Sequence, residues 1–308
     1  MLNFLLDIAP DKSQLLLTIK LAGILREKKQ EVYYTYTSNP AFTPVLYDKG
    51  ISNCVLYPDD FRWLKPDLTL LDCRHAAHAS LYWQLAIDYI FISMQLPDQK
   101  NIQDKDISIL YLPPTPYLSS GSGPRLETLT KRLQDIKKDK ERNIIVGLLG
   151  KGHKNSKILE DFYRVIKRSS IRNPRYQFIL LTDIPNVYQS SELPDNMELF
   201  RTLNLNTILP LCDLALTDSH SDAWLDCTFA QIPVLKYSPK DMINITPMKL
   251  EQQIEYALQN KTTLTQKAKE LCDFFERKNR EINKIADMLI ERAGRNRYNS
   301  CRLRPHTY

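Results

Sequence analysis

Apolar positions along the first part of the chain follow two different repeats. Residues 2–6 form a short apolar run, and residues 31–37 form a run rich in β-branched and aromatic side chains. Between them Leu17, Leu21 and Ile24 recur at spacings of four and three residues, which is the repeat of one helix face. The pattern therefore predicts a strand, a helix and a second strand. Two strands joined in this way run parallel and are connected by a right-handed crossover.

The same alternation continues over most of the chain. Short apolar runs predict further strands, and the segments between several of them predict helices. The strands are expected at residues 53–57, 67–72, 89–93, 107–112, 144–149, 177–181, 197–201, 214–217 and 234–237. The helices are expected at residues 76–86, 126–140, 157–168, 222–229 and 264–292. Strands that alternate with helices are typical of the α/β class, so we expect two Rossmann-like domains with parallel sheets.

The clearest change in composition falls between the two halves. Residues 113–116 are Pro-Pro-Thr-Pro and residues 119–124 are Ser-Ser-Gly-Ser-Gly-Pro, as in interdomain linkers. A long surface loop inside one domain is the alternative. We expect an N-terminal domain over residues 1–117, a linker over 118–125, a C-terminal domain over 126–290 and a basic tail over 291–308. Two such domains facing across a cleft make that cleft the default ligand site.

Composition narrows the class of protein and of ligand. The 308 residues are 43% hydrophobic and 25% charged, which suits a globular protein of two domains. The net charge of +6 favours anionic small molecules and does not imply nucleic acid, and a solvated basic surface is the simpler explanation of that charge. The six cysteines form no Cys-x-x-Cys pair, and no apolar run is long enough to span a membrane. We expect a cytoplasmic protein, with peripheral membrane contact or a protein partner left open.

Two polar segments of the second half have the composition of phosphate-binding turns. Gly150, Lys151 and Gly152 follow the strand expected at 144–149, and glycine lets backbone amides approach a phosphate closely. The spacing is neither a P-loop nor Gly-x-Gly-x-x-Gly, and a tight strand-to-helix turn is the alternative. Residues 217–222, Thr-Asp-Ser-His-Ser-Asp, follow the next central strand.

In this second turn, Ser219, His220 and the backbone amides can bind phosphate oxygens. Ser221 or Asp222 can cap the helix that follows. An ordinary polar turn with a helix cap remains the alternative. Because ligands of α/β proteins bind at the carboxyl ends of the strands, both turns are candidates for one ligand site.

The first half offers two carboxylates and two imidazoles. Asp7 ends the first strand and Asp11 follows it, so either is a candidate general base for an acceptor hydroxyl. Burial must raise the pKa of such a carboxylate for that role, and a helix-capping or loop carboxylate is the alternative. His75 and His78 form a His-x-x-His pair, which is weak evidence for zinc without Cys or Glu partners nearby. We expect both histidines in the first turn of a helix.

Residues 65–72, Lys-Pro-Asp-Leu-Thr-Leu-Leu-Asp, and the segment 211–237 resemble GT-B glycosyltransferases, in particular the UDP-glycosyltransferase type. That family commonly shows His-Gly-Gly-x-Asn-Ser/Thr, a Glu four residues after the Asn, and Gly-x-Pro before the next strand. Here Pro233 is kept and the other motif residues are replaced. Asp218 stands at the His, Ser219 and His220 at the two glycines, Asp222 at the Asn, Ala223 at the Ser/Thr, Asp226 at the Glu and Gln231 at the Gly before the proline.

The resemblance implies transfer of a sugar from a nucleoside diphosphate sugar, such as a UDP-sugar, to a hydroxyl acceptor. It implies no metal and no cofactor beyond this co-substrate, because helix dipoles and side chains can neutralise the departing diphosphate. The donor would contact Gly150, Lys151, Gly152, Ser219, His220, Asp222 and Asp226, and the acceptor would lie near Asp7 and Asp11. Only Lys240-Asp241 remains of the stretch that binds the sugar. Because Asp218 would repel a diphosphate, a catalytically inactive GT-B-like binding or partner subunit is the alternative.

Overall fold

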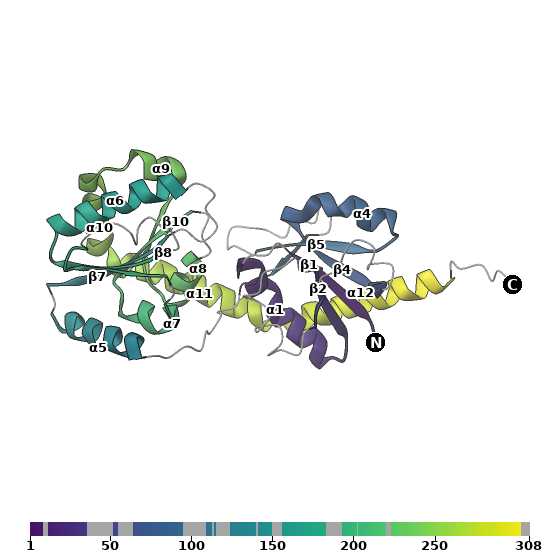
Figure 1. Cartoon of the computed structure of the whole chain (residues 1–308). Coiled ribbons are helices and arrows are strands. Elements are labelled where there is room, and N and C mark those ends of the chain that lie inside the picture. The colour runs from purple at the N-terminus through teal and green to yellow at the C-terminus, as the bar shows by residue number, and fades with distance from the viewer. Residues whose placement is uncertain are drawn as a thin grey trace. The chain divides into compact units, whose positions relative to one another are not determined.

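The computed structural model describes residues 1–8, 12–35, 52–54, 64–94, 109–112, 114, 124–139, 141–149, 156–182, 193–201, 203–219 and 223–302. Contacts divide the chain into two compact units, each built around one sheet (Figure 1). Unit 1 comprises Met1–Thr115 together with Asp273–Tyr308, and unit 2 comprises Pro116–Cys272.

The sheet of unit 1 has six parallel strands in the order β3-β2-β1-β4-β5-β6. They are β1 (Asn3–Asp7), β2 (Glu31–Thr35), β3 (Ser52–Cys54), β4 (Leu68–Asp72), β5 (Tyr89–Met94) and β6 (Ile109–Leu112). All six were predicted from the apolar runs. The order reverses direction at β1, so β1 and β4 flank the topological switch point of a Rossmann-type sheet.

Helices cover both faces of this sheet. Successive strand residues point to opposite faces, so Phe4 and Leu6 pack on one side and Leu5 on the other. The first side is covered by α1 (Lys12–Glu27) and α12 (Ile282–Arg302), and the second by α4 (Ala79–Gln84), which follows the 3₁₀ helix η2 (Cys73–His78). The single helix expected at residues 76–86 is therefore two shorter ones.

The sheet of unit 2 has five parallel strands in the order β11-β10-β7-β8-β9. They are β7 (Asn143–Leu149), β8 (Tyr176–Thr182), β9 (Met197–Phe200), β10 (Leu214–Asp218) and β11 (Val234–Tyr237). Gly147 lies inside β7, where an added Cβ would come within 2.3 Å of the Leu180 side chain. This glycine therefore permits close packing between neighbouring strands, and the order again places the switch point between β7 and β10.

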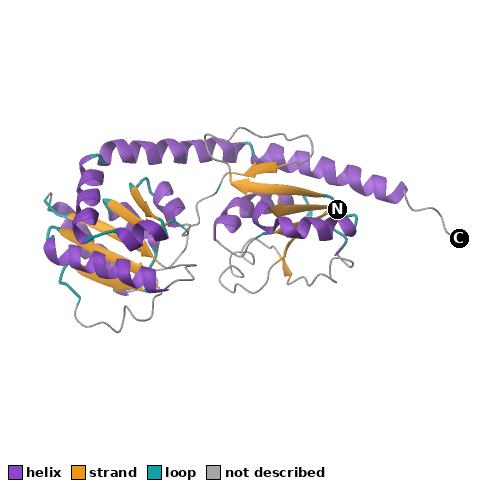
Figure 2. Cartoon of the chain, turned by 90° about the horizontal axis from the view of Figure 1, so that it is seen from above, coloured by secondary structure: helices purple, strands orange, loops and turns teal. Residues whose placement is uncertain are grey.

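Helices and strands also alternate along unit 2, and Figure 2 distinguishes the helices (purple) from the strands (orange). One face is covered by α5 (Pro124–Lys138), α7 (Leu205–Ile208), η4 (Leu209–Leu211) and α8 (Ala223–Phe229). The other is covered by α6 (Ser156–Arg172), α9 (Pro239–Asn244) and α10 (Pro247–Gln259), and α11 (Lys261–Arg280) follows. The sequence analysis missed α9 and α10, although Ser238 and Asp241 form a capping box and Pro247 opens α10.

The predicted class is confirmed, because each unit is a Rossmann-like α/β sheet. The limits of the two units differ from the expected 117, 126 and 290, since residues 273–308 group with unit 1. Much of the expected basic tail is helical: α12 extends to Arg302, and its Ala293 is fully buried against the core of unit 1. Among the described residues, no helix combines the length and the apolar character that crossing a bilayer requires.

Candidate functional site

The carboxyl ends of β1 and β4 meet at the switch point of unit 1. Asp7 ends β1 and lies opposite Leu71 of β4, so the chain that leaves β4 starts beside Asp7. That chain enters η2 immediately, at Cys73. Ligand sites of open α/β sheets form at this edge, next to the point where the strand order reverses.

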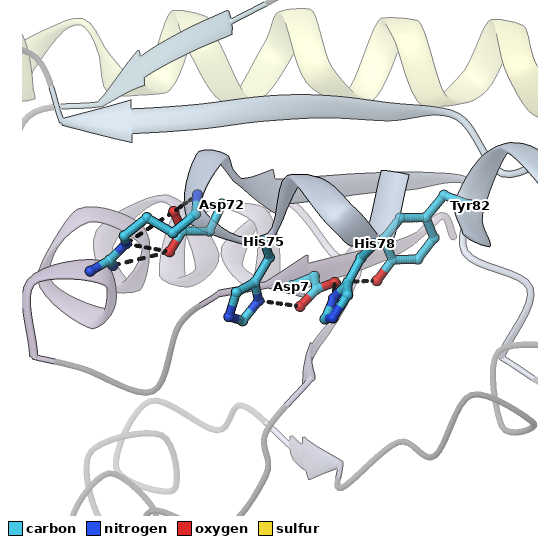
Figure 3. A network of polar contacts seen from close by, with 6 residues as sticks. Asp7, Asp72, His75, His78 and Tyr82 are labelled. Atoms are coloured by element: carbon cyan, nitrogen blue, oxygen red, sulfur yellow. Dashed lines mark hydrogen bonds and ion pairs between the residues drawn. The ribbon is translucent and has the colours of Figure 1, made fainter. Parts of the chain in front are cut away.

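Asp7 is the centre of a hydrogen-bonded cluster (Figure 3). Its Oδ1 lies 3.0 Å from Nδ1 of His75, and its Oδ2 lies 2.7 Å from Nδ1 of His78. The hydroxyl of Tyr82 donates to the same Oδ2 at 2.7 Å. An ionised carboxylate accepts hydrogen bonds only, so toward such a carboxylate both Nδ1 atoms are donors, and in the neutral form of either ring the lone pair is then on Nε2.

The local helix explains why the two imidazoles converge. His75 and His78 are three residues apart in η2, which is kinked at His75 (φ −99°, ψ 24°), and their ring centroids lie 4.9 Å apart. Asp72 fixes the start of this helix, because its carboxylate accepts from the backbone N–H of Arg74 at 2.9 Å and pairs with the Arg74 guanidinium. The following α4 then brings Tyr82 to Asp7.

Burial separates the roles of these side chains. The Asp7 side chain is 3% exposed, whereas the His75 and His78 side chains are 25% and 50% exposed. Burial, the charge of Asp7 and the hydrogen bond to Asp7 all raise the pKa of Tyr82 far above its usual range, so this hydroxyl stays a donor. The cluster is therefore a buried carboxylate that holds two solvent-accessible rings in place.

The same cluster contains a set of metal-ligating atoms. Asp7, His75 and His78 each offer one such atom, and the three atoms lie within 4.8 Å of one another. From the sequence, His75 and His78 were only weak evidence for a metal site, because no Cys or Glu near them in sequence could serve as a third ligand. The third group is Asp7, which only the pairing of β1 with β4 brings close.

Two of the residues expected to bind the donor lie in the described part of unit 2. Ser219 directly follows β10, is exposed, and donates its backbone N–H to the carbonyl of Tyr237 at 2.8 Å. Asp226 lies in the first turn of α8 and is 8% exposed. The other expected residues, Gly150, Lys151, Gly152, His220, Asp222 and, in unit 1, Asp11, lie outside the described residues.

Two residues near Asp226, Lys236 and Trp224, were not singled out from the sequence. The ammonium group of Lys236, on β11, lies 3.7 Å from the ring centroid of Trp224, on α8. Burial lowers the pKa of Lys236, and the aromatic face favours the charged form. The feature of the sequence that could have identified Lys236 is that it is a lysine inside an otherwise apolar strand. The contact places a cation and an aromatic ring beside the helix that carries Asp226.

A pocket of about 620 Å³ lies between β11, α9 and α10, and it includes Lys240 and Asp241 in its lining. The Asp241 carboxylate is already engaged, since it accepts from the hydroxyl and the backbone N–H of Ser238. These hydrogen bonds lower the pKa of Asp241. The residue therefore caps α9, which is a structural role for a position considered for sugar binding.

The arrangement of elements is that of known glycosyltransferases. The glycotransferase of kitacinnamycin is 12% identical with a TM-score of 0.66, over 94% of this chain and 98% of that chain. The spinosyn rhamnosyltransferase SpnG is 12% identical with a TM-score of 0.65, over 93% and 100%. The glycosyltransferase SnogD from Streptomyces nogalater is 14% identical with a TM-score of 0.61, over 95% and 99%.

These similarities define the fold. The neighbours are GT-B-type glycosyltransferases matched over nearly their whole length, so the expected GT-B fold is confirmed. SpnG has also been solved with thymidine diphosphate and with the spinosyn aglycone. No family model and no curated protein matches the sequence.

Proposed function

We propose that the chain is a glycosyltransferase that moves a sugar from a nucleoside diphosphate sugar to a hydroxyl acceptor. The observation that carries this proposal is the GT-B fold, matched over at least 92% of the chain by enzymes that include a rhamnosyltransferase solved with a nucleoside diphosphate and with an aglycone. Fold alone admits other functions, so the proposal also draws on the side chains at the strand ends.

The acceptor hydroxyl is activated in unit 1. Asp7 was expected to act as the base, but a buried carboxylate that already accepts three hydrogen bonds is better suited to orienting its partners. With Nδ1 held by Asp7, Nε2 of His78 or His75 takes the proton of the acceptor hydroxyl. The hydroxyl oxygen then forms a bond to the anomeric carbon, and the diphosphate leaves with the electrons of the broken bond. General-base assistance of this kind contributes about 10²–10⁴-fold in rate.

The donor is held in unit 2, at the ends of β7 and β10. The backbone amides and Lys151 of the turn after β7 bind phosphate oxygens, as do Ser219 and His220 after β10. Asp226 accepts hydrogen bonds from the ribose hydroxyls. These groups compensate the charge that develops on the departing diphosphate.

A thermal-shift panel of UDP, TDP, GDP, ADP and CDP tests the donor site. A nucleotide at a hundred times its Kd adds about 2.7 kcal/mol to the free energy of unfolding, which raises the Tm measurably. Asp226→Ala should abolish the shift, while Asp161→Ala, which removes an exposed carboxylate paired with Arg164, should leave it unchanged. If no nucleotide raises the Tm, the proposal fails.

One observation favours the alternative, a GT-B-like subunit without catalytic activity. Asp218 stands where the family has a histidine, and it is 1% exposed at the end of β10. A buried carboxylate at this position disfavours a neighbouring diphosphate. The same panel separates the two functions, because a subunit that has lost its donor site shows no nucleotide-dependent shift.

A further inference from the structure

We propose that Asp7, His75 and His78 form a binding site for one zinc-class divalent ion, and that the bound ion blocks the base of the proposed transfer reaction. The binding itself stands on the geometry of unit 1. The blocking effect rests on the proposed function.

Each imidazole lies near an Asp7 oxygen at a separation close to the one that zinc ligands have. Zn–N and Zn–O bonds of about 2.0–2.2 Å in a tetrahedral site place neighbouring ligand atoms about 3.3 Å apart. The Asp7 oxygens lie 3.0 Å and 2.7 Å from the two Nδ1 atoms. The three ligand atoms lie within 4.8 Å of one another, so side-chain rotation that draws them together would admit one ion in place of the Nδ1 protons.

The surroundings of the ligands are also those of a metal site. Tyr82 donates to Oδ2 of Asp7 and so fixes the carboxylate from outside the ligand set. The side chain of His78 is half exposed, which gives an ion a path from solvent and leaves room for water as the fourth ligand.

The donor types select the class of ion. Two imidazole nitrogens and one carboxylate suit Zn²⁺ and the neighbouring divalent transition metals. Mg²⁺ and Ca²⁺ prefer all-oxygen ligand sets, so they should compete poorly.

The consequence for the base follows from the two nitrogens of each ring. A neutral imidazole that binds an ion through Nδ1 carries its proton on Nε2. Ion binding therefore moves the ring proton from Nδ1 to Nε2 through solvent, with no net proton change for a neutral ring. Nε2 then donates and cannot accept the proton of an acceptor hydroxyl, so the metal-bound state and the base-competent state exclude each other.

Metal binding can be measured without any substrate. The full-length, tag-free chain is treated with chelator, and Zn²⁺ is titrated by isothermal calorimetry, with Co²⁺ absorption bands as a second readout of the ligand geometry. We expect one ion per chain. His75→Gln and His78→Gln keep a hydrogen-bond donor toward Asp7 and remove the metal ligand, so each should weaken binding about tenfold or more. His306→Gln is the matched control and should bind as the unaltered chain does.

Two results would overturn the site: absence of stoichiometric Zn²⁺ binding, or unchanged affinity in the chain with both His75→Gln and His78→Gln. Nucleotide-dependent thermal shifts in the same preparation would then still support the proposed function, so the two failures are distinguishable. In an active preparation, Zn²⁺ should suppress transfer and chelator should restore it. Faster transfer with Zn²⁺ would overturn the blocking effect, but it would not contradict the binding site itself.

Discussion

Two aspartates, one in each unit, are buried to a similar extent but differ in their partners and in their expected roles. Asp7 is 2% exposed and ends β1, whereas Asp213 is 6% exposed and directly precedes β10. Asp213 accepts from the backbone N–H of Ile144 at 2.8 Å and pairs with the ammonium groups of Lys137 and Lys261. Both carboxylates thus have several hydrogen-bond or ionic partners.

The difference lies in the partners and in the direction of the strands. Asp213 pairs with Lys137 of α5 and Lys261 of α11, so the Asp213 group is a fixed connection between α5, α11 and the sheet. The partners of Asp7 are two imidazoles and a phenol. Each imidazole has a second ring nitrogen, and the phenol oxygen has lone pairs, so these groups can also take part in chemistry. Asp7 also lies at the carboxyl end of its strand, where α/β proteins place ligands, while Asp213 lies at the amino end. The comparison teaches that the partners of a buried aspartate, and its end of the sheet, indicate its role.

The largest expected effect is on the transfer rate. Asp7→Asn keeps the size of the side chain but can no longer hold both imidazoles with Nδ1 as donor. We expect kcat to fall about 10³-fold, measured with the nucleotide sugar that the thermal-shift panel selects. Asp213→Asn, assayed at a temperature at which it is folded, should stay within about twofold of the unaltered chain. Equal losses of kcat in Asp7→Asn and Asp213→Asn would contradict the proposed difference between the two aspartates.

The second expected effect is on stability. Asp213→Ala removes the carboxylate acceptor of the Ile144 N–H and of Lys261, while Lys137 keeps the Leu211 carbonyl, and we expect a loss of about 2 kcal/mol in the free energy of unfolding. Solvent weakens the two ion pairs, because both lysine side chains are 40% exposed. Urea unfolding followed by circular dichroism measures the change, and a loss below about 0.5 kcal/mol would show that the group is dispensable.

The third prediction concerns pH. Burial alone would raise the pKa of Asp213, but the Ile144 N–H, Lys261 and Lys137 outweigh it and the pKa is lowered. A carboxyl with a lowered folded-state pKa stabilises the fold above its unfolded pKa of about 3.9, and this stabilisation is lost as the pH falls through the folded-state pKa. The stability difference between the unaltered chain and Asp213→Asn should therefore be full at neutral pH and shrink in acid. A difference that grows in acid would refute this sign.

The smallest effect is expected at Tyr82. Tyr82→Phe removes one hydrogen bond to Asp7 and leaves both imidazole contacts, so we expect a loss of about 1 kcal/mol in stability and a fall in kcat of less than about tenfold. Urea unfolding and steady-state kinetics measure the two quantities. A loss of rate as large as that of Asp7→Asn would give Tyr82 a direct part in the chemistry.

Local sequence was enough to predict most strands, because buried parallel strands are short apolar runs such as residues 144–149 and 214–217. It was also enough to identify the class of fold. It missed α9 and α10, whose start signals, Ser238 and Pro247, follow the last strand without a strong apolar repeat.

The site was only partly predictable for a different reason. Asp7, His75 and His78 were each singled out, but 68 residues separate Asp7 from His75. Their meeting depends on β4 pairing with β1, which follows from the strand order of the whole sheet and not from any local pattern. The proposed function therefore gives Asp7 the task of orienting the two imidazoles, whereas the sequence alone suggested Asp7 as the base.

The position of α12 in unit 1 affects the order in which the two units can fold during translation. Ile282, Ala286, Leu289 and Ala293 complete the core against α1 and the sheet, yet they are translated after all of unit 2. The ribosome therefore releases the strands of unit 1 and α1 long before α12, which covers the rest of that face, while unit 2, which is continuous in sequence, can close first. The part of the unit 1 core that α12 covers is the last to be enclosed, so the nascent chain has an apolar surface that chaperones or early aggregation can reach.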